Sequence, residues 1–147
     1  MSWQKIIEEL NHKLELQQWK STAEVIEWFT KIEDKKKLRF FIYDRVGYYP
    51  SISPELLDRA LEFARNEIFI SDFDISVIKQ ARKTFLFHKG EPWMKKGNVN
   101  GFDIGMGAFD GAECCDLVGL YLLNKITKSD IFSKENCGLY RDDGLAV

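Results

Sequence analysis

The sequence predicts an α+β fold in which helices pack on a small antiparallel sheet. Apolar residues recur at helical spacing in several long stretches, and short apolar runs near residue 40 and after residue 136 are typical of strands. The chain has 147 residues, 45 % hydrophobic and 30 % charged, a globular composition large enough for one domain with a core. No apolar run approaches the roughly 18 residues that a membrane helix needs, and the start does not have the pattern of a signal peptide.

Two amphipathic helices are predicted before residue 37. The apolar face of the first is formed by Trp3, Ile6, Ile7, Leu10 and Leu14. Ser21 and Glu24 then have the pattern of a capping box, in which side chains satisfy free amides at a helix start. The second apolar face is formed by Val25, Ile26, Phe29 and Ile32.

An apolar and aromatic run over 38–43 predicts a buried strand that ends at Asp44. Ser53 followed by Pro54 is a strong helix start, because Ser caps the free amides and Pro suits the first helical position. That helix is expected over about 54–67. A further helix, capped by Asp72 or Asp74, is expected to reach Ala81.

The middle of the chain predicts a hairpin at 84–95, divided by Lys89-Gly90. Residues 97–107 are rich in Gly and Asn, which favours a loop. A strongly apolar stretch then predicts a helix over about 109–127.

The last residues predict a second hairpin. Residues 137–140 form its first strand, 141–144 its turn with the favoured Asp-Gly pair, and Leu145 begins the returning strand. The chain stops where that strand should continue, so we expect a truncated sequence.

Composition restricts the chemistry that is possible. The three cysteines, Cys114, Cys115 and Cys137, contain no Cys-x-x-Cys pattern, which disfavours a disulfide framework or zinc site and favours a reducing intracellular setting. The net charge of −2 lacks the basic excess that is typical of nucleic-acid binding. Lysines cluster at 31–37 and at 89–96, but such runs are usually solvated faces.

Three carboxylates could carry chemistry: Asp44 at a strand end, and Asp142 and Asp143 in the terminal hairpin. If these strands are neighbours, the acids meet at one sheet edge, where their charges repel one another. Mg²⁺ relieves such repulsion, and two ions together suit nucleotidyl transfer. A plain surface turn at Asp142-Asp143, and a helix cap or salt bridge at Asp44, are the structural alternatives.

These residues resemble catalytic motifs of reverse transcriptases. Phe41-Ile42-Tyr43-Asp44 with Tyr48-Tyr49-Pro50-Ser51-Ile52-Ser53 is similar to the first motif, and Tyr140-Arg141-Asp142-Asp143 to the Tyr-x-Asp-Asp motif. Between them, Met106-Gly107-Ala108-Phe109-Asp110-Gly111-Ala112 resembles the glycine-containing loop and helix beneath the incoming nucleotide. The amino-acid sequence over most of the chain resembles that of retroelement reverse transcriptases, including the Penelope-like group.

The resemblance implies a polymerase palm that performs RNA-directed DNA synthesis on a template with a primer, from deoxynucleoside triphosphates. It implies that Asp44, Asp142 and Asp143 bind two Mg²⁺ or Mn²⁺ ions, with the backbone carbonyl of Arg45 as a further ligand. The chain would be one partial domain, 1–147. Residues 1–37 would form a helical N-terminal part. Residues 38–147 would form the palm, with the 84–95 hairpin inserted.

Other roles follow from the same resemblance. Tyr49 would pack against the sugar of the incoming nucleotide, although an ordinary half-buried aromatic residue is the alternative. Met106 and Gly107 would border the nucleotide or template, although Gly107 also fits a plain loop. Tyr140 would support the hairpin. The two N-terminal helices and the 84–95 hairpin would form a partial fingers region.

The sequence also departs from the family. Arg45 and Gly47 stand where relatives have an apolar residue and a polar or acidic one, and Met106 replaces a Gln. A side chain that grips the triphosphate is not assigned, with Arg39, Arg82 and Lys83 as candidates. Thumb and primer grip are missing, so we expect little activity from this chain alone.

Alternative functions stay open. One is an inactive or domesticated palm that binds nucleic acid or protein, and another is a related palm-type nucleotidyltransferase or cyclase. A third is a helical interaction module, which predicts that Asp44 lies far from Asp142.

Overall fold

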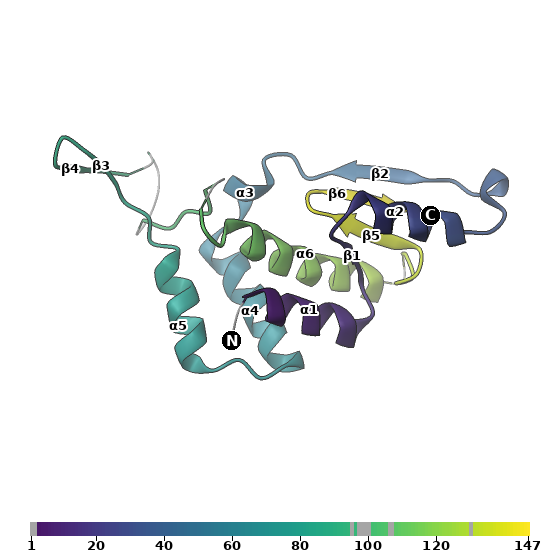
Figure 1. Ribbon diagram of the computed structural model, residues 1–147, viewed down its shortest axis with the longest axis horizontal. Helices are drawn as coiled ribbons and strands as arrows, with labels where there is room; N and C mark the ends of the chain where they lie inside the picture. Colours follow the sequence, from purple (N-terminus) through teal and green to yellow (C-terminus); the bar gives the residue numbers. More distant parts are fainter. Residues whose placement is uncertain (1–2, 95, 97–100, 106–107, 130) are drawn as a thin grey trace.

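The computed structural model describes residues 3–94, 96, 101–105, 108–129 and 131–147. A mixed α+β architecture is formed in these ranges, so the predicted fold class is confirmed at that level (Figure 1). In chain order the elements are α1 (Trp3–Leu14), β1 (Gln17–Trp19), α2 (Thr22–Lys31), the 3-10 helix η1 (Lys35–Lys37), β2 (Phe41–Asp44), α3 (Tyr48–Ser51), α4 (Pro54–Glu67), α5 (Asp72–Ala81), β3 (Leu86–His88), β4 (Glu91–Trp93), α6 (Gly111–Lys128), β5 (Cys137–Tyr140) and β6 (Asp143–Ala146).

Helix α6 is the centre of the core, between the sheet on one side and α1 and α4 on the other (Figure 1). Its buried apolar side chains explain this position: leucines recur at spacings that leave little of the helix for solvent. Those that are essentially inaccessible are Cys114, Leu117, Val118, Leu120 and Leu123. Helices α1 and α4 both contact this helix, and their Leu10, Leu57 and Leu61 belong to the same buried cluster. No helix within the described ranges combines the length and the apolarity that crossing a membrane requires.

The helix starts follow the local signals. Ser53 Oγ accepts a hydrogen bond from the Leu56 amide at 3.2 Å, and Ser21 Oγ accepts one from the Glu24 amide at 3.3 Å. Both predicted caps are thereby confirmed. The cap of α5 is different from the prediction, because Ser71, not Asp72 or Asp74, accepts the amide hydrogen bond.

The four-stranded sheet has the order β1-β5-β6-β2. Strand β1 runs parallel to β5, whereas β6 is antiparallel to both β5 and β2. The sheet is therefore mixed, and the prediction of a purely antiparallel sheet is wrong. The cause is β1, whose Gln-Gln-Trp sequence has no apolar alternation that could have predicted a strand. Strand β1 also has a contact outside the sheet: Gln18 Nε2 donates a hydrogen bond to the carbonyl of Asp116 on α6 at 2.8 Å.

Strand β2 was predicted to be buried, and this is wrong. It lies at the edge of the sheet, with Ile42 82 % and Phe41 52 % exposed. It also begins at Phe41, not at Leu38. An apolar run indicates a strand but does not indicate its place in a sheet, which pairing with β6 decides here.

The terminal hairpin has a shorter turn than predicted. The loop consists of Arg141 and Asp142, and Asp143 and Gly144 already belong to β6. Gly144 pairs with Tyr43, and a Cβ on Gly144 would collide with the Tyr43 ring. The Asp-Gly pair is thus explained by close packing across the sheet, not by the turn.

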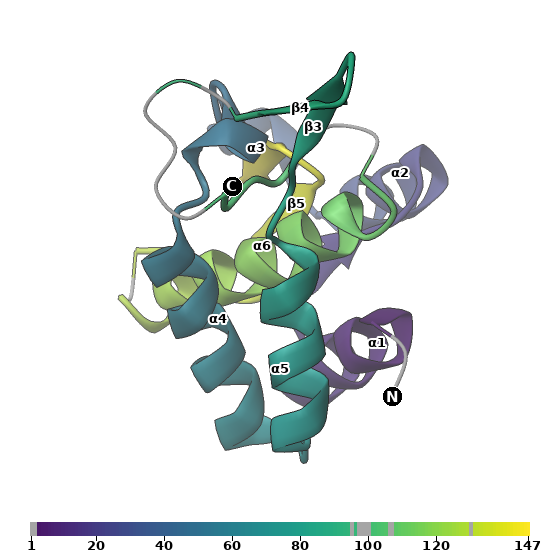
Figure 2. The ribbon, with the colours of Figure 1, turned by 90° about the vertical axis from the view of Figure 1, so that its left-hand side faces the viewer.

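The remaining elements agree with the sequence in type. The predicted hairpin is present as β3 and β4, is exposed, and projects away from the helices in both views (Figures 1 and 2). Residues 101–105 have neither helix nor strand, as expected of a loop, apart from an isolated bridge between Phe102 and Lys83. The short helix α3 was not predicted.

Candidate active site

Asp44 and Asp143 lie opposite each other on neighbouring strands. Strand β2 pairs with β6 in the register Asp44 to Asp143 and Tyr43 to Gly144. The amide of Arg45 donates to the carbonyl of Asp142 at 3.2 Å, which makes Asp44 and Asp143 a non-hydrogen-bonded pair. In such pairs the Cα atoms are about 4.5 Å apart and the side chains are at their closest. The predicted meeting of these strands is confirmed, and the hypothesis of a distant Asp44 is wrong.

The two side chains point to the face of the sheet that is turned away from α6. Side chains alternate between faces along a strand, and Leu139 and Gln18 mark the α6 face by their burial against that helix. Asp143, Asp44 and Tyr140 belong to the opposite set of positions. Asp44 and Asp143 are both exposed, so Asp44 is not the costly buried acid that the sequence predicted.

Asp142 faces different surroundings. It is half-buried and, together with Tyr49, lines a small cavity of about 110 Å³ between the turn, α3 and α6. The structure therefore brings two predicted site residues from distant parts of the chain to one cavity. The other residues that line it are Tyr48, Ala112, Cys115, Asp116 and Arg141.

Asp116 is a site residue that sequence reasoning missed. It is half-buried on α6, and burial, followed by the charge of Glu113, raises the pKa of its carboxyl group above the ordinary value. Arg141, Lys20 and Arg45 oppose this rise. An acid within the apolar stretch 112–123 was the available signal. Burial also raises the pKa of the neighbouring Cys115 thiol to about 12, so this cysteine is a poor nucleophile.

The Arg45 side chain turns inward beneath the turn. Its Nη2 donates to the carbonyl of Arg141 at 2.6 Å, and its guanidinium carbon is 3.8 Å from the centroid of the Tyr48 ring. Tyr48 is itself fixed, because its hydroxyl donates to the Cys115 carbonyl at 2.6 Å. Gly119 on α6 lies next to this side chain, but it gives room to Gln18: a Cβ there would come 2.9 Å from Gln18 Nε2 and only within ordinary contact, 3.6 Å, of Arg45 Nη2.

Other predicted residues have mixed outcomes. Tyr140 pairs with Asp143 across the hairpin, and its supporting role stays a prediction. Arg82 is 2 % exposed and paired with Asp110, so it cannot reach a triphosphate from this position. Met106 and Gly107 lie outside the described residues, and their predicted roles stay predictions.

The acids fit a hard cation in part. Mg²⁺ takes oxygen ligands and is usually held by one or two carboxylates together with substrate phosphates. Asp44 and Asp143 offer such a pair on one exposed face. No group of three or more His, Cys, Asp and Glu side chains in the described ranges is arranged to hold a metal ion. Asp142 lines the cavity instead, so the three carboxylates do not form one ready-made metal site in this arrangement.

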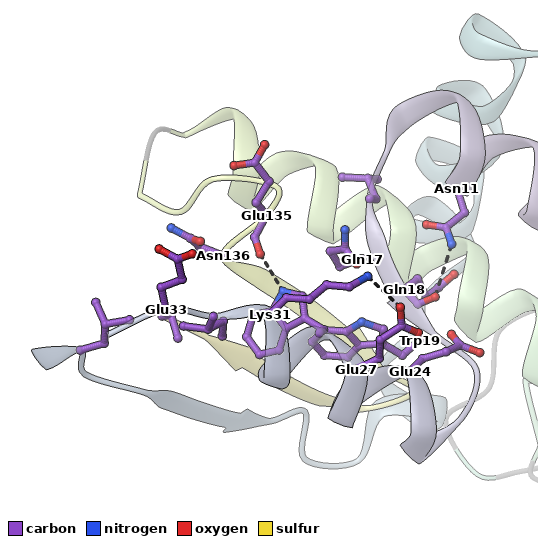
Figure 3. A pocket seen from close by; sticks show the side chains of 15 residues that line it. Asn11, Gln17, Gln18, Trp19, Glu24, Glu27, Lys31, Glu33, Glu135 and Asn136 are labelled. Carbon is purple, nitrogen blue, oxygen red and sulfur yellow. Dashed lines mark hydrogen bonds and ion pairs between the residues drawn. The ribbon is translucent and has the colours of Figure 1, made fainter. Parts of the chain in front are cut away.

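A second cavity, of about 660 Å³, is shown in Figure 3, and none of these acids lines it. Trp19 and Trp28 form part of its wall, with ring centroids 5.0 Å apart. Several of its polar groups already have partners: Trp28 Nε1 donates to the Glu135 carbonyl at 2.6 Å, and Lys31 pairs with Glu27 at 2.7 Å. None of the predicted site residues lines it.

The surroundings of Asp44, Asp142 and Asp143 are the candidate site because the strands that carry the two acidic sequence motifs are neighbours there. Comparison of the chain with family models, with curated proteins and with solved structures finds no match.

Proposed function

We propose that this chain is the palm portion of a retroelement reverse transcriptase, which extends a primer on an RNA or DNA template by two-metal nucleotidyl transfer. The observation that carries the proposal is the cross-strand pair of Asp44 and Asp143, next to the turn that holds Asp142. The sequence resemblance supports the same assignment, because the paired strands are those of its two acidic motifs.

Like charges directly opposite each other on a sheet are destabilising. Asp44 and Asp143 are in this arrangement, and a bound cation would reverse the sign of their contribution. Their carboxylates, with Asp142 and the Arg45 carbonyl, would hold Mg²⁺ or Mn²⁺. When bound, two such ions activate the attacking 3′ hydroxyl and stabilise the leaving pyrophosphate.

The other residues of the site would position the nucleotide. Tyr49, which is half-buried and lines the same cavity as Asp142, would form a wall against the sugar of a nucleotide whose phosphates are held at the acids. Such a wall favours deoxynucleotides, because a 2′ hydroxyl needs space that the ring occupies. Thumb and primer grip would come from additional polypeptide, and the setting would be the cytoplasm or nucleus, with which three free, buried cysteines agree.

A second candidate function is an inactive palm that binds nucleic acid or protein. The observation in its favour is Arg45, which places a permanent positive charge directly after Asp44, where a bound cation would be repelled.

Calorimetry separates the two candidates. Mn²⁺ is titrated into the chain with a primer-template that ends in a dideoxynucleotide and with a matching deoxynucleotide, so that no turnover occurs. Binding should be present in the wild type, weak in Asp44→Asn and in Asp143→Asn, and unchanged in Glu62→Gln, a control on the exposed side of α4. Absence of binding, or equal binding in all variants, contradicts the polymerase assignment and favours the inactive palm.

A further inference from the structure

Arg45 holds both residues of the hairpin turn. Its backbone amide donates to the carbonyl of Asp142 at 3.2 Å, and its side-chain Nη2 donates to the carbonyl of Arg141 at 2.6 Å. Two successive carbonyls of the turn are thus bound by one residue from the neighbouring strand. The position of the turn relative to β2 therefore depends on Arg45.

The turn is of a kind that needs such support. Arg141 has φ +57°, in the left-handed region that residues with a side chain seldom adopt. Unfavourable backbone conformations of this type persist where surrounding contacts enforce them. The hydrogen bond from Arg45 Nη2 ends on the carbonyl of this same residue. It is a direct means of keeping Arg141 in its conformation.

The guanidinium group donates a hydrogen bond to the turn and contacts the ring of Tyr48. Its Nε and Nη1 atoms are buried without a hydrogen-bond partner in the described part of the chain. Tyr48 of α3 stacks on the group, and Gly119 of α6 borders it. Buried guanidinium nitrogens without acceptors are costly. The stack on Tyr48 and the hydrogen bond to the Arg141 carbonyl are the contacts that offset this cost, and the second of them holds the turn.

We infer that Arg45 is a positioning residue. Through the Arg141 and Asp142 carbonyls it sets the turn, and with it Asp142 and Asp143, against Asp44. The inference rests on the proposed function, since the acids are positioned for a cation. It also assigns a role to a residue that departs from the apolar residue of the family resemblance.

The direction in which Arg45→Met changes the affinity for Mn²⁺ tests this role. A guanidinium that acts only through its charge would repel a nearby cation, so Arg45→Met would bind Mn²⁺ more tightly than the wild type. A positioning residue gives the opposite result: Arg45→Met should bind Mn²⁺ about tenfold more weakly, because the turn loses a charge-assisted hydrogen bond. Affinity is measured by calorimetry, and the broadening of the residue 44, 142 and 143 amide signals by Mn²⁺ shows which residues the ion approaches.

Arg141→Gly supplies the matched rescue. Glycine adopts positive φ without steric cost, so in this background the turn no longer depends on Arg45. Arg45→Met should then change Mn²⁺ affinity less than twofold. If Arg45→Met does not fold, Arg45→Lys takes its place, because a compact ammonium group does not reproduce the planar stack on Tyr48.

A measurement without metal distinguishes the two possible failures. Hydrogen exchange of the residue 45 amide reports its bond to the Asp142 carbonyl, and should be at least about tenfold faster in Arg45→Met. The Leu61 amide in α4 should be unaffected. If the wild type binds no Mn²⁺, the proposed function fails, and exchange still decides whether Arg45 holds the turn. If the wild type binds Mn²⁺ but Arg45→Met binds it equally or more tightly, or if exchange is unchanged, the inference about Arg45 is wrong.

Discussion

Two arginines of this protein differ in how far their side chains are buried and in the groups that they contact. Arg82, at the end of α5, is 2 % exposed and pairs with the carboxylate of Asp110. Arg45, at the end of β2, is half-buried and bonds to a backbone carbonyl and stacks on Tyr48. The first charge has a carboxylate in direct ion-pair contact, whereas the second, among the described residues, acts on the carboxyl of Asp116 without forming an ion pair. An arginine with a carboxylate partner becomes part of the core, whereas one with a carbonyl partner holds a loop.

The Arg82 pair connects three distant parts of the chain. Asp110 stands at the start of α6, and its other carboxylate oxygen accepts a hydrogen bond from Trp3 Nε1 of α1 at 3.2 Å. Arg82 follows α5, so the ion pair joins α5, α6 and α1. A carboxylate at a helix N-terminus is also favoured by the helix dipole.

The largest expected effect comes from breaking this pair. Asp110→Asn leaves the Arg82 charge buried and uncompensated, so we expect a loss of about 3–5 kcal/mol in the free energy of unfolding. Urea denaturation measures it. The double variant Arg82→Met with Asp110→Asn should recover most of the loss, because it leaves no buried charge and keeps an acceptor for Trp3 Nε1. A loss below about 1 kcal/mol in Asp110→Asn would mean that the pair does not carry the stability ascribed to it.

Replacing the other arginine, Arg45, should have little effect on the free energy of unfolding. Arg45→Met leaves no carboxylate without a partner, and water can reach the Arg141 carbonyl in an exposed turn. We expect the free energy of unfolding to stay within about 1 kcal/mol of the wild type. The same denaturation experiment measures it. A loss as large as that of Asp110→Asn would remove the distinction between the two arginines.

The pH dependence of stability sharpens the comparison. Burial raises the pKa of Asp116 in the folded chain, so the folded state binds this proton more tightly than the unfolded state. The stability that this bound proton contributes is therefore lost as the pH rises from about 3.9, the ordinary pKa of Asp, through the higher pKa of the folded chain. Asp116→Asn should be more stable than the wild type at pH 7, and the difference should shrink as the pH falls toward about 3.9, below which the folded and unfolded states both bind the proton.

Arg45 enters this prediction because its charge lowers the pKa of Asp116. Removing it should raise that pKa further, so Asp116→Asn should gain more stability at pH 7 in the Arg45→Met background. An equal gain in both backgrounds would mean that the guanidinium does not act on this carboxyl group. Denaturation series at several pH values provide the data.

The smallest expected effect concerns the acidic pair itself. Asp44→Asn removes the repulsion from Asp143 across the strands and should stabilise the chain by about 0.2–1 kcal/mol when divalent ions are chelated. High salt should reduce the gain by screening, since both side chains are exposed. Glu62→Gln is the control. Lower stability in Asp44→Asn would show that the two carboxylates do not repel one another.

Several features could be predicted because neighbouring residues decide them. The caps at Ser21 and Ser53, the helix Pro54–Glu67 and the 84–95 hairpin follow from local chemistry and agree with the structure. The strand at Asp44 and the terminal hairpin were also predicted, although their boundaries moved. The pairing of these strands was a hypothesis from the acidic motifs, and their register now supports it.

The sequence by itself determined the order and type of most helices and strands, because periodicity, caps and turn residues act over a few positions. Only the tertiary structure decided that Gln17–Trp19 is a strand parallel to β5, that β2 is an exposed edge, and that Gly144 lies beneath Tyr43. It also decided which arginine meets a carboxylate and which meets a turn. These outcomes depend on contacts between residues far apart in the chain, whose free energies no local pattern expresses.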